Sequence, residues 1–208
     1  MNLPNSITIL RIALAVVLAP LILAGGALPR LAAFVLFLVA ALSDLWDGYL
    51  ARSRKMVTDL GKLLDPIADK LLLAATLLPL YALSLRGDAA EFPWFGGVLP
   101  LWIVLVIFAR EIFITLFRSY AARRGVVIAA GRSGKYKAVF QNLFVGSAIL
   151  WYALHALEAR HGWGGGWESW IPIHRAFSIT ALSVAVLLTL YSMGEYLLRY
   201  RRLVPGAA

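Results

Sequence analysis

The chain reads SDLWDGYLAR at residues 43–52 and GKLLDPIADK at residues 61–70. The first stretch carries two aspartates three residues apart, and the second carries two aspartates four residues apart, so each pair shares one face of a helix. A short connection makes the two helices antiparallel neighbours. The two carboxylate pairs are therefore expected to meet at one depth of the fold. The four residues are Asp44, Asp47, Asp65 and Asp69.

The composition around these stretches is that of a membrane protein. Of 208 residues, 61% are hydrophobic and only 15% are charged, whereas a soluble domain carries about 25% charged residues. The absence of cysteine excludes disulfides, zinc–thiolate sites and a thiol nucleophile. In so apolar a chain, the net charge of +9 indicates contact with anionic lipid rather than with nucleic acid.

Six apolar stretches reach the length of about 20 residues that a helix needs to cross a bilayer. They are Ser6–Ala24, Leu31–Leu50, Leu64–Leu83, Val98–Phe117, Ala138–Leu157 and Ala176–Leu198. The chain is thus predicted to be one all-α integral membrane domain over residues 1–208. Aromatic rings are expected at the outer interface, from Trp94 and Phe95 in the third loop and Trp163, Trp167 and Trp170 in the fifth loop.

Lysine and arginine are distributed unevenly between the two sides. The second and fourth loops and the C-terminal tail carry Arg52, Arg54, Lys55, Lys62, Arg118, Arg123, Arg124, Arg132, Lys135, Lys137, Arg199, Arg201 and Arg202. The opposite side carries Arg30, Arg86, Arg160 and Arg175. Because positive loops stay in the cytoplasm, these loops, both termini and the aspartates are predicted to face it.

Four carboxylates in apolar helices are costly and repel one another unless cations lie between them. Hard oxygen ligands suit Mg²⁺ or Mn²⁺, and two such ions can clamp the attacking and leaving oxygens of a phosphoryl transfer. Gly48 and Ala51 leave room beside the aspartates, Gly61 permits a tight turn, and Arg52 can bind a phosphate. Simple pairing of the aspartates with nearby cations explains this density of charge less well. A cation transporter is only a remote alternative. A transporter would place its carboxylates near the middle of the membrane, whereas all four of these lie toward one side.

The eight spaced residues resemble the signature of the CDP-alcohol phosphotransferase family, D-x2-D-G-x2-A-R-x8-G-x3-D-x3-D. The resemblance implies that family's six-helix fold, transfer from a CDP-linked donor to an alcohol with release of CMP, two divalent ions and a homodimer. It implies that Asp44, Asp47, Asp65 and Asp69 hold the metals and that Asp69 is also the general base. It further implies that Gly48, Ala51, Arg52 and Gly61 line the cytidine and diphosphate site.

Two further parts of the chain, the start and a second part in two pieces, resemble the bacterial phosphatidylglycerophosphate synthases within this family. They are residues 2–11, the run from Arg110 to Arg118, and residues 133–137 followed by Gln141. This resemblance implies CDP-diacylglycerol as donor, glycerol 3-phosphate as acceptor and a place in the bacterial inner membrane. Inositol phosphate, serine and phosphatidylglycerol stay open as acceptors, as does the choice between Mg²⁺ and Mn²⁺.

A phosphorylated acceptor needs cations beside the metals, and four residues are candidates: Arg110, Arg118, Lys135 and Lys137. The last three could instead only obey the positive-inside rule. Glu111, next to Arg110, is expected to point away from it. Asn5 and Thr8 share one face of the first helix with Arg11 and are candidates for lining the site, although Asn5 could be a helix cap.

The three histidines, His155, His161 and His174, cluster around the fifth loop. They are expected to be solvated or interfacial, on the side of the membrane opposite to the aspartates.

Overall fold

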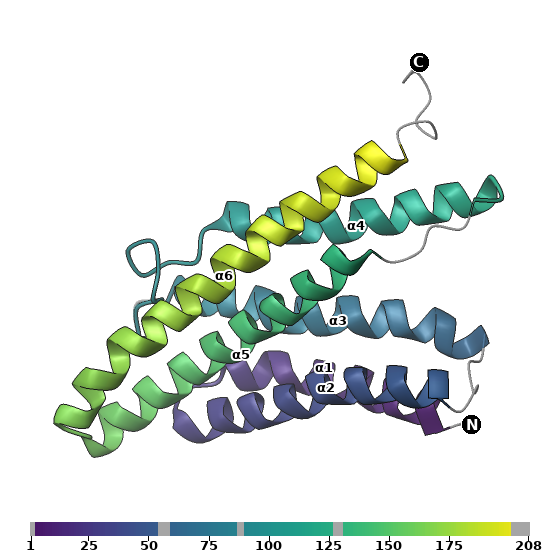
Figure 1. Ribbon diagram of the computed structural model, residues 1–208. Helices are drawn as coiled ribbons and strands as arrows, with labels where there is room; N and C mark the ends of the chain where they lie inside the picture. The colour runs from purple at the N-terminus through teal and green to yellow at the C-terminus, as the bar shows by residue number, and fades with distance from the viewer. Residues whose placement is uncertain (1–2, 54–58, 87–89, 127–130, 201–208) are drawn as a thin grey trace.

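The computed structural model consists of six long helices (Figure 1). It describes residues 3–53, 59–86, 90–126 and 131–200, and within these ranges the side chains of residues 3–4, 45, 47–53, 59–60, 62–63 and 132 are not described. The helices are α1 (Leu3–Leu23), α2 (Ala27–Ser53), α3 (Asp59–Ser84), α4 (Leu101–Arg123), α5 (Arg132–His161) and α6 (Gly165–Arg199). The all-helical fold predicted from the sequence is confirmed.

Each predicted span falls largely within one of these helices. Within the described residues, five helices are long and apolar enough to cross a membrane: α1, α2, α3, α5 and α6. α4 is long enough, but Arg110, Glu111 and Arg118 interrupt its apolar run. These charges are tolerated in a helix bundle because they find partners on α5 and α6.

The helices pack so that the aspartate-bearing ends of α2 and α3 face α5. α1 packs against both α2 and α3, α5 packs against α2 and α6, and α4 packs mainly against α6. Figure 1 shows α5 and α6 crossing the other helices obliquely. The end of α2, the start of α3, the start of α5 and the ends of α4 and α6 lie toward the same end of the molecule.

α2 and α5, which both reach this end of the molecule, pack closely against each other. Gly146 on α5 lies against the ring of Phe37 on α2, and a Cβ at that glycine would lie 3.1 Å from Phe37 Cε1. Phe37 itself is buried in the apolar core, together with Phe144 and Ala148 of α5. A larger side chain at Gly146 would therefore push α2 and α5 apart.

The prediction that Trp167 and Trp170 lie in a loop is wrong, because α6 begins at Gly165. Gly164, with φ of 61°, takes the turn into the helix. Trp167 is buried, and its ring lies 4.9 Å from that of His155 on α5. The loop thus ends within the glycine run. The indole of Trp167 packs between α5 and α6, whereas Trp170 is exposed on α6.

The expectation of a solvated or interfacial histidine is also wrong for His174, which is buried. Its Nε2 lies 2.9 Å from Ser147 Oγ and 3.1 Å from the Ser147 carbonyl oxygen. Ser147 is in turn hydrogen-bonded to Ser178. A polar side chain in an apolar helix pair is retained where it finds such partners. His161 is exposed, as expected.

Candidate functional site

Two of the four aspartates meet on a single buried arginine of α1. Nη1 of Arg11 lies 2.6 Å from Asp44 Oδ1 on α2 and 3.1 Å from Asp69 Oδ1 on α3. The arginine side chain has no solvent exposure, whereas the two carboxylates are 44% and 59% exposed. The fold therefore brings carboxylates from both helices to one cationic point, with their outer faces open.

A third aspartate is held by the same face of α1. Thr8 Oγ1 donates a hydrogen bond of 3.0 Å to Asp65 Oδ1. Asn5 and Thr8 are both buried, although they are polar residues in an apolar helix. The face of α1 that the sequence singled out thus lies against the aspartate ends of its neighbours. Whether Asn5 and Thr8 also touch a substrate stays a prediction.

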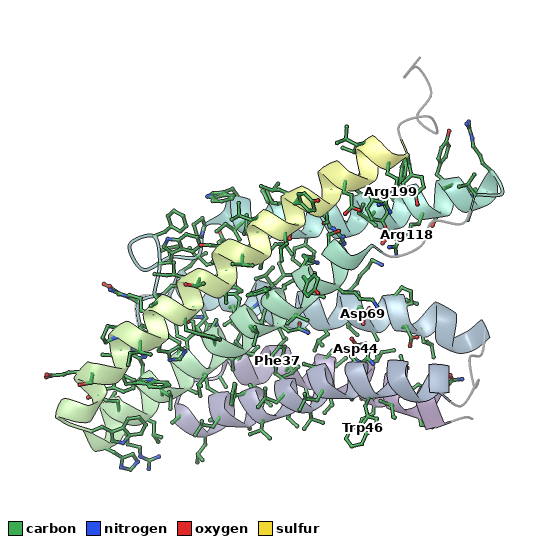
Figure 2. The ribbon with its side chains drawn as sticks, viewed as in Figure 1. Phe37, Asp44, Trp46, Asp69, Arg118 and Arg199 are labelled. Atoms are coloured by element: carbon green, nitrogen blue, oxygen red, sulfur yellow. The ribbon has the colours of Figure 1, made fainter. Side chains whose placement is uncertain are left out.

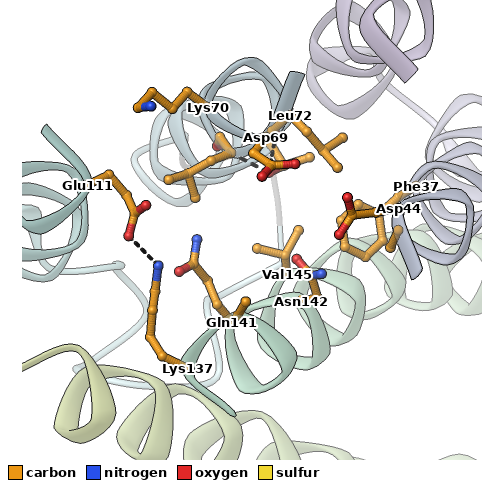
Figure 3. Close-up of a pocket in the computed structure, with 14 residues that line it drawn as sticks. Phe37, Asp44, Asp69, Lys70, Leu72, Glu111, Lys137, Gln141, Asn142 and Val145 are labelled. Atoms are coloured by element: carbon orange, nitrogen blue, oxygen red, sulfur yellow. Dashed lines mark hydrogen bonds and ion pairs between the residues drawn. The ribbon is translucent and has the colours of Figure 1, made fainter. Parts of the chain in front are cut away.

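The two carboxylates line a pocket between α2, α3, α4 and α5 that spans about 690 Å³, including open solvent. Figure 2 shows Asp44 and Asp69 on neighbouring helices that face the start of α5. Apolar side chains line the pocket between the polar ones: Leu72 lies beside Asp69, Phe37 beside Asp44 and Val145 beside Asn142 (Figure 3). The polar residues are Asp44, Asp69, Lys70, Thr76, Glu111, Lys137, Gln141 and Asn142.

The wall opposite the aspartates carries a buried ion network. Lys137 donates to Glu111 Oε1 across the pocket wall (Figure 3). Arg110 Nη1 donates to the same Glu111 oxygen at 2.9 Å. The expectation that Glu111 points away from Arg110 is wrong, because both long side chains bend toward α5, where Lys137 supplies a second cation. The pocket is thus acidic on one side and lined by a lysine on the other.

Two of the cations proposed from the sequence lie away from this pocket. Arg118 donates through Nε and Nη2 to the hydroxyl of Tyr196 on α6. Its guanidinium carbon lies 5.5 Å from the centre of the tyrosine ring. Lys135 is exposed on the first turn of α5 and does not line the pocket. Their roles toward a substrate stay predictions.

Glu111 is the pocket residue that reasoning from the sequence passed over. A carboxylate in the middle of an apolar run is itself a signal of a buried partner. The nearest cation to Glu111 along the chain is Arg110. Nothing in the sequence indicates that Glu111 also contacts Lys137, 26 residues away. Gln141 was noticed only as part of a resembling segment, yet its amide lies beside Lys137 in the pocket (Figure 3).

Several predicted site residues lie outside the described part of the site. They are Asp47, Gly48, Ala51 and Arg52, whose side chains near the end of α2 are not described. Gly61 lies half-buried in the first turn of α3.

The described carboxylates are chemically suited to bind a divalent cation. The Asp44 and Asp69 oxygens that approach Arg11 Nη1 come from different helices and accept from the same positive group. Carboxylate oxygens are also the ligands that Mg²⁺ and Mn²⁺ prefer. Among the described side chains, no group of three or more acidic or histidine residues is close enough to hold a metal ion. A metal site that includes Asp47 therefore stays a prediction.

Known proteins resemble this chain along most of its length. A "CDP-diacylglycerol--glycerol-3-phosphate 3-phosphatidyltransferase" of Bacillus subtilis (strain 168) is 37% identical over 207 aligned residues, covering 94% of this chain and 93% of the relative. A "Probable phosphatidylglycerophosphate synthase" of Mycobacterium tuberculosis (strain CDC 1551 / Oshkosh) is 33% identical, covering 99% and 84%. A relative in Rickettsia bellii (strain RML369-C), with the same name as the first, is 34% identical over 72% of this chain and 75% of its own.

The profile of one protein family covers the whole described site. Residues 1–198 match the family described as CDP-alcohol phosphatidyltransferase. The match includes all four aspartates, the α1 face and the ion network of α4 and α5. The chain therefore belongs to the CDP-alcohol phosphatidyltransferase family and is a transferase.

Proposed function

We propose that this enzyme transfers the phosphatidyl group of CDP-diacylglycerol to glycerol 3-phosphate, forming phosphatidylglycerophosphate and CMP in a divalent-metal-dependent reaction. The observation that carries the proposal is the pocket itself, in which Asp44 and Asp69 face a wall that presents Lys137. Both substrates carry phosphate groups, so they need cations on more than one side. The printed names of the relatives support this donor and acceptor.

On the donor side, the proposed metal ligands are Asp44, Asp47, Asp65 and Asp69. When bound, Mg²⁺ or Mn²⁺ neutralises charge on the diphosphate and stabilises the charge that develops during transfer. Gly48, Ala51, Arg52 and Gly61 form the proposed cytidine and diphosphate site. Thr8 holds Asp65 in place through its hydrogen bond, and Arg11 draws Asp44 and Asp69 together.

Asp69 is the proposed general base. Its Oδ1 accepts from Arg11, which orients the carboxylate while its exposed side faces the pocket. It takes the proton from the acceptor hydroxyl, and the resulting oxygen attacks the phosphorus that carries the diacylglycerol. A new P–O bond forms, the P–O bond to CMP breaks, and CMP leaves with the bonding electrons. No protein nucleophile takes part, so rate enhancement comes from positioning and electrostatics.

On the acceptor side, Lys137 is the proposed contact to the phosphate of glycerol 3-phosphate. It is buried in the pocket wall, and its ammonium is held by Glu111. Arg110, Arg118 and Lys135 add positive charge around the same end of the fold. The proposed location is a bacterial inner membrane, with the pocket open to the cytoplasm, where both a nucleotide-linked donor and a phosphorylated acceptor are present.

The test is CMP release by purified protein in detergent, with CDP-diacylglycerol, Mg²⁺ and one acceptor at a time. We expect release with glycerol 3-phosphate and loss of release in EDTA, restored by Mg²⁺ or Mn²⁺. Parallel reactions contain serine, inositol phosphate or phosphatidylglycerol. Release with one of these alcohols but not with glycerol 3-phosphate would overturn the proposed acceptor. Full activity in EDTA would overturn the metal requirement.

A further inference from the structure

Glu111 occupies a position between two cations, only one of which lies in the pocket wall. Its Oε1 accepts from Lys137 Nζ on α5 and from Arg110 Nη1 on α4. Glu111 and Lys137 both line the pocket, whereas Arg110 does not. The three charges are therefore ordered from the helix interface toward the cavity: arginine, carboxylate, lysine.

Arg110 is fixed by two hydrogen bonds, to α6 and to Glu111, and so acts as an anchor for the carboxylate. Its Nε donates to Ser192 Oγ on α6 at 3.2 Å, and its Nη1 donates to Glu111 at 2.9 Å. A Cβ placed on Gly134 of α5 would lie 3.5 Å from Nη2. A planar guanidinium held at each end cannot swing into the cavity without losing these contacts. The carboxylate of Glu111 is thus held firmly from behind.

Lys137 keeps donors available on the pocket side. An ammonium group has three N–H donors, and the Glu111 carboxylate accepts one of them. An unrestrained four-carbon stem samples many rotamers, and binding a ligand would have to select one of them. Because the side chain is only 6% exposed and is already paired with Glu111, much of that ordering is complete before a ligand arrives.

A second observation points to ligand binding at this wall. Gln141 is 7% exposed and follows Lys137 by one helical turn. Its Oε1 is buried and accepts no hydrogen bond from any described residue. Buried polar atoms are nearly always satisfied. The oxygen therefore marks a place where a hydroxyl or another donor from a bound molecule completes the site, next to the lysine.

We propose that Glu111 is a positioning residue for the acceptor: its carboxylate, anchored by Arg110, holds the Lys137 ammonium in the orientation that binds the acceptor's phosphate. The inference rests on the proposed function, in which the acceptor is glycerol 3-phosphate. Glu111 does not itself contact the substrate. Since the three side chains together carry one net positive charge, the wall still attracts an anion.

The experiment compares steady-state kinetics of the wild type, Glu111→Gln, Glu111→Asp and Lys137→Ala, with each substrate varied in turn. We expect Glu111→Gln to raise KM for glycerol 3-phosphate about tenfold, because the ion pair between Lys137 and Glu111 becomes a weaker hydrogen bond from the ammonium to an uncharged amide. KM for CDP-diacylglycerol should change less than about twofold, since the donor side is untouched. Glu111→Asp, which keeps the charge, should recover part of the loss. In a Lys137→Ala background, Glu111→Gln should add almost nothing, because the two act as one unit.

Glu195→Gln is the matched control. Glu111 joins α4 to α5, and Glu195 likewise joins α6 to α5. It accepts from Ser133 Oγ at 2.6 Å and pairs with Arg199 at 3.1 Å, but it does not line the pocket. An equal rise in acceptor KM in this control would mean that any loosening of α5 has the same effect, and would overturn the proposal. A lower acceptor KM in Glu111→Gln would overturn it too, because the carboxylate would then compete with the phosphate. Absence of CMP release by the wild type with glycerol 3-phosphate would instead contradict the proposed function itself.

Discussion

Arg11 shows how one buried side chain organises the acidic side of the pocket. It comes from α1, yet its guanidinium contacts carboxylates on α2 and α3. A buried cation needs compensating negative charge, and two carboxylates that share a site need a positive one. Each group thus stabilises the other. The positive charge of this one arginine is therefore matched by carboxylates from two other helices.

Replacing Arg11 with Ala should lower the melting temperature in EDTA by about 5 °C, since it leaves two carboxylates facing each other; this figure allows for their partial exposure to solvent. Added Mg²⁺ should reduce the difference from the wild type, because a divalent cation replaces the lost charge. Thermal unfolding in detergent, with and without Mg²⁺, measures both.

Arg30→Ala is the matched control for this substitution. Arg30 is also a buried arginine, but it lies over the ring of Tyr152 at 5.9 Å. Its loss should lower the melting temperature equally with EDTA and with Mg²⁺. If Arg11→Ala behaved in the same way, the carboxylates would not be a cation site.

Asp69→Asn should reduce kcat for CMP release by at least about 10²-fold, because a neutral amide cannot accept the acceptor's proton. Binding of CDP-diacylglycerol should persist in part, since the remaining aspartates still face the donor. Single-turnover CMP release and equilibrium donor binding are the two measurements. Glu158→Gln, at the far end of α5, should leave both unchanged. Wild-type turnover in Asp69→Asn would show that another group is the base.

At the scale of helices, the pocket depends on the distance between α2 and α5. α2 carries Asp44, and α5 carries Lys137 and Gln141, so the two walls belong to different elements. The contact between Gly146 and Phe37 sets how closely these elements approach. Glycine at a helix crossing permits close approach where any other side chain would hold the backbones apart.

Gly146→Leu should therefore lower the melting temperature by about 5 °C, as expected for 1–3 kcal/mol of overpacking. It should also lower kcat/KM for CMP release, because the donor and acceptor walls separate. Gly194→Leu makes the same change on α6, where a Cβ would meet no atom within 4 Å. That control should keep activity close to the wild type. Equal losses in both variants would show that the added leucine side chain itself, and not the contact with Phe37, is responsible.

Across the whole molecule, the described cations that are predicted to be cytoplasmic lie at the same end as the pocket. Arg118 and Arg123 lie near the end of α4, Lys135 and Lys137 near the start of α5, and Arg199 at the end of α6. These helix ends lie toward the end of the bundle where α2 ends and α3 begins (Figure 1). The buried His174 and the indole of Trp167 lie toward the opposite end, between α5 and α6. The pocket is accordingly expected to open on the cytoplasmic side.

The chain has no cysteine, so single cysteines can report this orientation. Ser119 on α4 and Ser169 on α6 are both exposed and lie near opposite ends of the molecule. In intact cells, a membrane-impermeant maleimide should label Ser169→Cys but not Ser119→Cys, because only the outer side is reachable. Both should be labelled after the membrane is opened. The reverse pattern in intact cells would invert the proposed topology.

The amino-acid pattern alone determined the six-helix class, the approximate spans and the acidic cluster. These features follow from local information: apolar runs of bilayer length, and aspartates spaced by one helical turn. The resemblance of the eight spaced residues also predicted the family, which the match over residues 1–198 confirmed. A periodic pattern says which residues share a face of a helix, and that was enough to group Asn5, Thr8 and Arg11.

The tertiary structure decided which of these faces meet. Arg11 contacts Asp69 across 58 residues, and Lys137 contacts Glu111 across 26. The direction of a long charged side chain depends on the partner that packing supplies. For this reason the expectation that neighbouring Arg110 and Glu111 point to different sides of α4 was wrong. Likewise, a histidine beside a glycine-rich loop looked solvated until α6 was seen to begin at Gly165. Local spacing selects helix faces, whereas the free energy of burying charge selects partners, and those partners come from distant parts of the chain.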